Sequence, residues 1–232
     1  MSRSLRRIFL GALLVAGGGF LTAQSGELTV EQLYLRNIEF QVLRERAFAT
    51  DPNLKTAVLV ELATRIEQGL GSNEQFQIEF ILEYLAMEGI TQRLREGNRL
   101  INNHPEIRRE AAKLLGEVGG ERAKDALVTV LLRDTEPIVR SEAAFSLGKI
   151  GLNTNNEVVE ALSFTMIRMN PAEPDNGFAY ASVVAIERIA QQNNGITDPA
   201  AFEALIKIAQ GSYYRSVRNK ALQVLADMKN YQ

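Results

Sequence analysis

The chain has no cysteine and only one histidine among its 232 residues. Without cysteine it cannot form disulfides, cannot be lipidated at an N-terminal cysteine and cannot build a thiolate metal site. A single histidine, His104, excludes metal clusters that need several histidines. Stability therefore has to come from packing, and we expect no metal and no other cofactor.

Familiar catalytic patterns are also missing. No serine lies in a Gly-x-Ser-x-Gly turn, and a Ser-His-Asp triad would have to use His104. The glycine-rich stretch 116–121 is not a phosphate loop, because no strand precedes it and no Lys-Ser/Thr follows it. With 28 acidic residues some carboxylate pair is inevitable, and such a pair is no signal by itself. We therefore predict that the chain is not an enzyme and that it has no catalytic residue.

The first 25 residues have the three-part layout of a secretory signal. Three arginines precede a largely apolar, uncharged run that is too short for an ordinary membrane-spanning helix, and small residues follow it. We expect cleavage after Ala23 or Ser25, with export to the periplasm or cell envelope as the result. Arg6 and Arg7 partly match the twin-arginine motif of proteins exported in the folded state. The alternative is that the segment stays on as a membrane anchor.

Without these 25 residues the chain has 23 basic and 28 acidic residues. A negative chain with no long basic run is a poor match for nucleic acid or for an anionic membrane. We expect neither as a partner, and we expect no membrane insertion of the mature chain. The oligomeric state stays open.

Apolar residues recur at i, i+3, i+4 and i+7 almost everywhere after residue 26, which predicts an all-helical protein. The stretch HPEIRREAAKLLGEVG, residues 104–119, returns as EPIVRSEAAFSLGKIG, residues 136–151. The same register continues at Ala179 and Arg218, with a second apolar-periodic segment between successive copies. Helix pairs that repeat every 30–40 residues predict a solenoid, because one pair cannot bury its apolar face alone. The predicted regions are a signal peptide (1–25), a capping helix (27–50), a degenerate repeat and connector helix (51–103) and repeats (104–230).

The units at 104 and 135 resemble HEAT repeats of the short bacterial type that is also found in phycobilisome-lyase-like proteins. The resemblance implies a right-handed α-solenoid whose second helices line a concave face. It also implies that the arginines at the repeated position join neighbouring units, although Ala179 interrupts their row. The residues given this structural role are Arg108, Arg140, Arg218 and Asp134.

Partner binding is the remaining function class, and three features favour it. The segment 158–169 is apolar on more than one face, the proline-containing loop after Arg168 is the longest interruption of the repeats, and an aromatic pair precedes Arg218. The alternative is that these residues are core or plain surface. The candidate partner-binding residues are Phe164, Met166, Met169, Pro171, Pro174, Phe178, Tyr213 and Tyr214.

These observations predict an exported, non-enzymatic HEAT-repeat scaffold or assembly factor that binds a protein or peptide partner in the cell envelope. Two alternatives remain. One is a lyase-like or chaperone-like protein that holds a small ligand, although no feature indicates a tetrapyrrole pocket. The other is a purely structural envelope protein.

Overall fold

The computed structural model describes residues 29–229. It divides into a unit that ends at Asn37 and a second unit that begins at Ile38 and contains all the repeats. Helix α1 (Val30–Phe48) crosses this boundary. The predicted signal peptide, residues 1–25, lies outside the described residues. Within residues 29–229, no helix has both the length and the apolar character that a membrane span requires.

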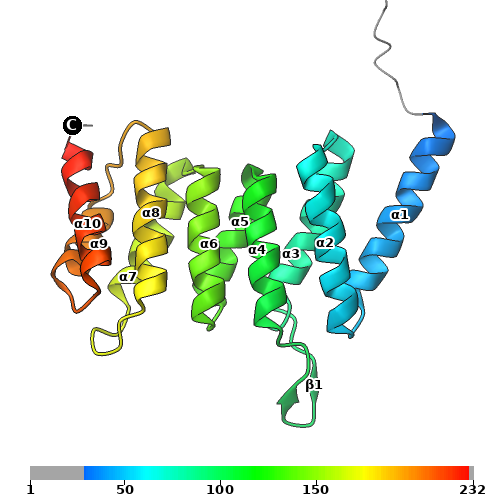
Figure 1. The fold of residues 1–232 in the computed structure, drawn as a ribbon, viewed down its shortest axis with the longest axis horizontal. Coiled ribbons are helices and arrows are strands. Elements are labelled where there is room, and N and C mark those ends of the chain that lie inside the picture. The colour runs from blue at the N-terminus through cyan, green and yellow to red at the C-terminus, as the bar shows by residue number, and fades with distance from the viewer. Residues whose placement is uncertain (1–28, 230–232) are drawn as a thin grey trace, which may run out of the picture. The chain divides into compact units, whose positions relative to one another are not determined.

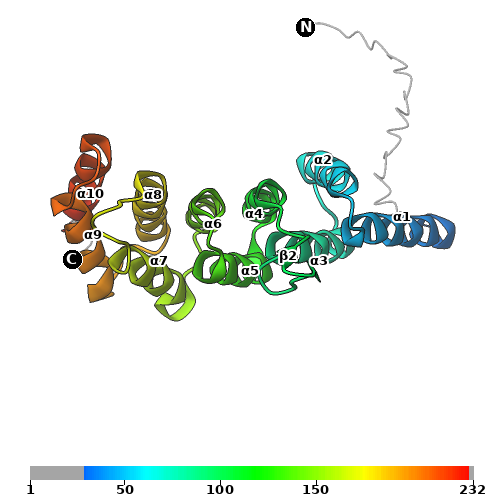
Figure 2. The ribbon, with the colours of Figure 1, turned by 90° about the horizontal axis from the view of Figure 1, so that it is seen from below.

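Helices of the second unit alternate between two layers (Figures 1 and 2). One layer holds the first helices of the pairs: α2 (Pro52–Gln68), α4 (Pro105–Val118), α6 (Pro137–Ile150), α8 (Asn176–Gln192) and α10 (Arg215–Met228). The other holds the second helices: α3 (Ser72–Met87), α5 (Gly120–Arg133), α7 (Glu157–Ile167) and α9 (Pro199–Gln210). A short 3-10 turn, η1 (Thr154–Asn156), precedes α7. The all-α solenoid predicted from the repeat spacing is confirmed.

Proline and aspartate define where several helices begin. Asp51 and Asp198 accept hydrogen bonds from the backbone N–H groups of Asn53 and Ala200, each at 2.9 Å. The following prolines occupy the first helical position, where a missing N–H leaves no bond unmade. These caps fix where α2 and α9 begin.

The first helices α4, α6 and α8 pack unusually close together at the Leu-Gly motif. A Cβ atom on Gly116 would lie 2.6 Å from the Cβ of Ser146 on α6. A Cβ atom on Gly148 would lie 2.5 Å from the Cα of Ala185 on α8. Glycine is required at both positions because no side chain fits between the helix backbones.

The connector helix predicted within residues 51–103 is wrong. Residues 95–100 form a small antiparallel hairpin instead, with β1 (Arg95–Glu96) paired to β2 (Arg99–Leu100), and it protrudes from one edge of the stack (Figure 1). Gly97 adopts φ +59° at the turn, a conformation that favours glycine and breaks a helix. The buried Asn102 side chain closes the base of the hairpin through bonds to Leu94 N (2.9 Å) and Gln92 O (2.7 Å).

Candidate partner-binding groove

At two places in the stack, a cation on a first helix pairs with a carboxylate that precedes the following first helix. Arg108 on α4 is 2% exposed and forms a salt bridge with the buried Asp134, which precedes α6. Its Nε donates to Asp134 Oδ2 (2.7 Å) and its Nη2 donates to Asp134 Oδ1 (3.2 Å). Lys55 on α2 makes the corresponding contact to Glu88, ahead of α4, at 2.5 Å, and both side chains are buried. In both pairs the carboxylate belongs to the segment that immediately precedes the first helix of the following unit.

Arg218 differs from the role predicted for it. Its side chain is exposed and has no ion pair or hydrogen bond to any described residue. The physical reason is that α10 is the last helix of the described chain, so no following unit within residues 29–229 offers a carboxylate. Arg218 is therefore no inter-repeat joint in this structure.

Arg140, on α6, is the exception inside the stack. Its side chain is half-buried, and its guanidinium lies 4.6 Å from the ring centre of Phe178 on α8 instead of forming a salt bridge. Burial lowers the pKa of Arg140, and the charges of Asp175 and Asp134 only partly offset this effect. Arg140 therefore keeps N–H donors that no described residue uses.

Arg140 lines a groove of about 410 Å³. Other lining residues come from the 168–175 loop, which protrudes from one edge of the stack (Figure 1). Leu132 comes from the end of α5, Arg140 from the start of α6 and Phe164 from the end of α7. The loop after α7 adds Arg168 and Met169. We call this cavity the Phe164 groove. Its volume lies within the range of ligand sites.

Phe164 is the aromatic side chain among the described residues that line the groove. It is 55% exposed, and the Arg168 guanidinium lies 5.1 Å from its ring centre. Leu132 is exposed as well, and Met169 is half-buried against the core. An exposed phenylalanine beside arginine is the composition of an interface anchor.

Asn176 connects the 168–175 loop to the start of α10. Its Oδ1 accepts a hydrogen bond from Tyr214 N (2.7 Å), and its Nδ2 donates to Pro174 O (3.3 Å). Tyr214 is thus held beside the loop with its side chain 71% exposed. The structure therefore brings together the loop and the aromatic pair that the sequence singled out separately. Pro171 is exposed on the loop.

Three of the predicted partner-binding residues belong to the core. Met166 and Phe178 are fully buried, and Tyr213 is 7% exposed, so none of them can contact a partner directly. The physical reason for Met166 is that α7 packs against both neighbouring second helices, α5 and α9, as well as α8. Burial raises the pKa of Tyr213, and the nearby charge of Asp175 adds to the effect.

An acidic cluster on α5 and α7 already has its cation. Carboxylate oxygens of Glu121, Asp125 and Glu157 lie within 4.8 Å of one another. The Lys124 ammonium contacts Glu121 (2.7 Å) and Asp125 (3.0 Å), and it also pairs with Glu157. The Lys124 ammonium therefore occupies the place among the three carboxylates that a bound metal ion would take.

An aromatic cluster on α1 and α3 was not predicted from the sequence. The Phe48 ring centre lies 4.2 Å from that of Tyr84 and 6.2 Å from that of Phe80, and Arg122 lies 4.9 Å from the ring of the exposed Phe76. The signal was the spacing of Phe76, Phe80 and Tyr84 by four residues, which places them on one face of a helix.

Comparison with known proteins agrees with this architecture. The family model for HEAT repeats matches residues 88–164. A chain from the complex of CpcE and CpcF of phycocyanin lyase from Nostoc sp. PCC7120 has a similar structure, with a TM-score of 0.50 and 16% sequence identity. The similarity covers 82% of this chain and 99% of that chain. A search of curated proteins gave no match.

The prediction that the chain is not an enzyme is corrected by this comparison. The same helical fold occurs in a phycocyanin lyase, so missing catalytic motifs do not exclude an enzyme. At 16% identity the likeness concerns the fold, and no catalytic residue is transferred to this chain.

Proposed function

We propose that this chain, whose residues 88–164 are HEAT repeats, binds a protein partner through the Phe164 groove. The observation that carries the proposal is the exposed Phe164 ring, which lies with Arg168 at a groove that also contains the half-buried Arg140. Because stacked helices hold these groups in place before binding, little conformational entropy is lost when a partner docks.

The residues that line the groove indicate which kind of partner segment would bind there. An apolar side chain would pack on Phe164, Leu132 and Met169, where it removes apolar surface from water. A carboxylate would accept charge-assisted hydrogen bonds from the unused N–H groups of Arg140. Glu173 and Asp175, which also line the groove, disfavour a strongly anionic partner. The fitting segment is therefore apolar with one acidic group.

We further propose that the chain acts in the cell envelope as a scaffold or assembly factor. The support is the signal-like layout of residues 1–25 together with a preformed binding surface in the repeats. Cell fractionation and mass spectrometry of the N-terminus test the location. A chain recovered from the cytoplasm with Met1 still attached would contradict it.

Binding is tested with two matched serine substitutions. Phe164→Ser removes the groove anchor, and Leu222→Ser removes an apolar side chain of similar exposure, 55% against 54%, on α10. The tagged full chain of each variant is crosslinked in cells, and the bound proteins are identified by mass spectrometry. We expect a partner that is retained by Leu222→Ser and lost from Phe164→Ser. A partner retained equally by both variants would contradict the groove assignment, as would the absence of any reproducible partner.

Lyase-like activity is a second candidate, favoured by the fold shared with the phycocyanin lyase chain. A protein that handles a chromophore should show visible absorbance when it is purified from its source. A purified chain without such absorbance, which also fails to bind an added chromophore, would exclude this candidate.

A further inference from the structure

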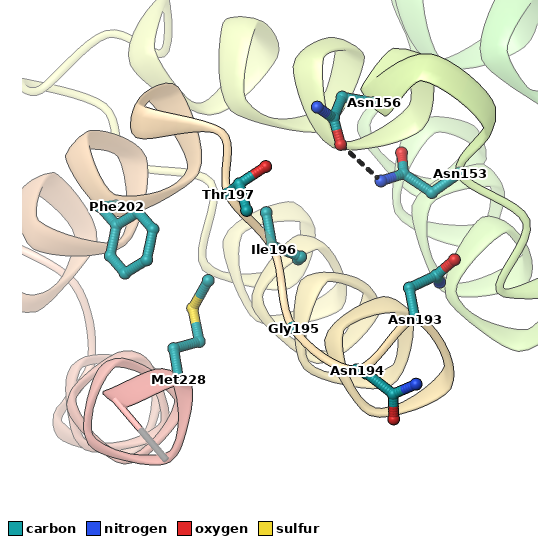
Figure 3. A pocket seen from close by; sticks show the side chains of 9 residues that line it. All are labelled: Asn153, Asn156, Asn193, Asn194, Gly195, Ile196, Thr197, Phe202 and Met228. Carbon is teal, nitrogen blue, oxygen red and sulfur yellow. Dashed lines mark hydrogen bonds between the residues drawn. The ribbon is translucent and has the colours of Figure 1, made fainter. Parts of the chain in front are cut away.

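A second cavity, of about 400 Å³, is lined by residues of the segments that join α6 to α7 and α8 to α9. These segments lie on the opposite edge of the stack from the 168–175 loop (Figure 1). The cavity lies between the two segments, and it reaches α10 (Figure 3). Four asparagines line it: Asn153 and Asn156 from the first segment, Asn193 and Asn194 from the second. We call it the asparagine pocket.

None of the described side chains that line the asparagine pocket carries a charge. A charged ligand would therefore lose its hydration without gaining an ion pair, which costs several kcal/mol in a partly buried site. This argument excludes phosphates, carboxylates and metal ions as favoured ligands. It leaves neutral molecules with hydrogen-bonding groups.

The asparagines retain unused hydrogen-bonding groups of both kinds. Asn153 is engaged, because its Oδ1 accepts from Val159 N (3.1 Å) and its Nδ2 donates to Asn156 Oδ1 (3.2 Å; Figure 3). The Nδ2 donors of Asn156 have no partner among the described residues, and neither has the Oδ1 acceptor of Asn193. Asn194 is exposed with its whole amide available. Each amide can offer two donors and one carbonyl acceptor.

The other side of the pocket is apolar. Phe202 and Met228 lie across the cavity from the asparagines, and Ile196 lies between the two groups (Figure 3). A ligand that fills the pocket has to place a polar edge against the amides and an apolar face against Phe202 and Met228. Sugar rings have this combination, since hydroxyl groups both donate and accept at their edge while C–H groups form their faces.

We propose that the asparagine pocket binds a neutral saccharide of about one or two rings, a size that suits its volume. Asn156 Nδ2 donates to a ring hydroxyl, the Asn194 amide both donates and accepts, Asn193 Oδ1 accepts a hydrogen bond from a further hydroxyl, and Phe202 packs against a C–H face. The amides do not titrate, so binding should not change between pH 5 and 8. This site is independent of the Phe164 groove.

The test uses glycine substitutions that preserve the backbone. Asn156 and Asn194 have φ of +64° and +54°, which glycine adopts readily, so Asn156→Gly and Asn194→Gly remove the amide without straining the turn. Asn155→Gly is the matched control, because Asn155 has φ +53° in the same segment and lies outside the pocket lining. Binding of cellobiose, maltose and N,N′-diacetylchitobiose to the full chain is measured by saturation-transfer NMR and calorimetry, with glucuronic acid as the charged comparison.

We expect saturable binding of at least one neutral saccharide, weakened about fivefold by either pocket substitution, as for the loss of one neutral hydrogen bond. Asn155→Gly should leave binding unchanged, and glucuronic acid should bind no better than the neutral sugars. Lack of saturable binding by all three neutral saccharides would overturn the proposal. Equal weakening by Asn155→Gly, or stronger binding of a neutral blocked dipeptide at the same residues, would overturn it too.

Discussion

Arg108 and Asp134 form a bidentate ion pair that joins one repeat to the next, with N–O distances of 2.7 and 3.2 Å. Asp134 Oδ1 also accepts a hydrogen bond from Glu136 N (2.9 Å), next to the start of α6. The third guanidinium nitrogen of Arg108, Nη1, donates to Asn103 Oδ1 (2.8 Å) and to Glu88 O (3.5 Å). Both charges are buried, so each depends on the other for its compensation.

Arg108→Ala should destabilise the chain by about 3–5 kcal/mol, because it leaves the Asp134 carboxylate buried without its cation. Urea unfolding followed by circular dichroism measures the change. Arg218→Ala is the matched control. Because that arginine is exposed and unpaired within the described residues, its removal should cost less than about 1 kcal/mol. A similar loss of unfolding free energy in both variants would contradict the role of the Arg108–Asp134 pair in joining the repeats.

Gly148→Ala should destabilise the folded chain by about 1–3 kcal/mol. The added Cβ would lie 2.5 Å from the Cα of Ala185 and would force α6 and α8 apart. Gly177→Ala makes the same chemical change at the start of α8. The nearest atom to a Cβ there is 3.5 Å away, so it should be neutral or slightly stabilising. Thermal unfolding of both variants separates helix propensity from close packing. A melting temperature of Gly148→Ala at or above that of the unmodified chain would contradict the packing argument.

The fold could be predicted from the sequence because the residues that pack between neighbouring helices recur at the same positions of each repeat. Ala111, Ala112 and Leu115 recur as Ala143, Ala144 and Leu147, and all six are fully buried. Residues 95–100 could not be predicted, since a two-residue strand is too short to produce a readable alternation. Their hairpin depends on a single glycine turn and on the side chain of Asn102, which lies just after the second strand.

The candidate site was only partly predictable. Exposed Phe164 and buried Met166 lie two residues apart on α7, and the sequence shows both as apolar positions of one helix. Which of them faces solvent depends on how α7 packs between its neighbours, and periodicity does not reveal this when several faces are apolar. The asparagine pocket needs two segments about 40 residues apart in sequence to meet, which only the stacked structure shows.

Lys124 predicts a pH dependence of stability. Its hydrogen bond lowers the pKa of Glu121. Burial lowers the pKa of Lys124, but its hydrogen bonds to Glu121, Glu157 and Asp125 outweigh burial and raise it overall. A lowered carboxyl pKa contributes stability that is complete above the ordinary value of 4.5 and is lost as the pH falls through the folded value.

Lys124→Met should therefore destabilise the chain at pH 7, and its difference from the unmodified chain should shrink as the pH falls from 5 to 3. Urea midpoints of both proteins at several pH values measure the difference. Lys113→Met provides the control, since Lys113 pairs with Glu110 at an exposed surface (2.9 Å) and should matter little at any pH. A difference between Lys124→Met and the unmodified chain that stays constant from pH 3 to 7 would contradict the role of the carboxylates.

Arg140→Met distinguishes a joint from a binding group. Methionine keeps the apolar stem that packs near Phe178, and it removes a charge that the fold holds at a cost, since burial lowers the pKa of Arg140. The substitution removes the contact with the Phe178 ring and the attraction of Asp175 and Asp134, but it also removes the larger cost of burying the charge, so unfolding in urea should show a change below about 1 kcal/mol. Partner retention in the crosslinking experiment should nevertheless fall as it does for Phe164→Ser. If Arg140→Met instead cost as much stability as Arg108→Ala, Arg140 would be a joint of the stack and the groove would lose its charged anchor.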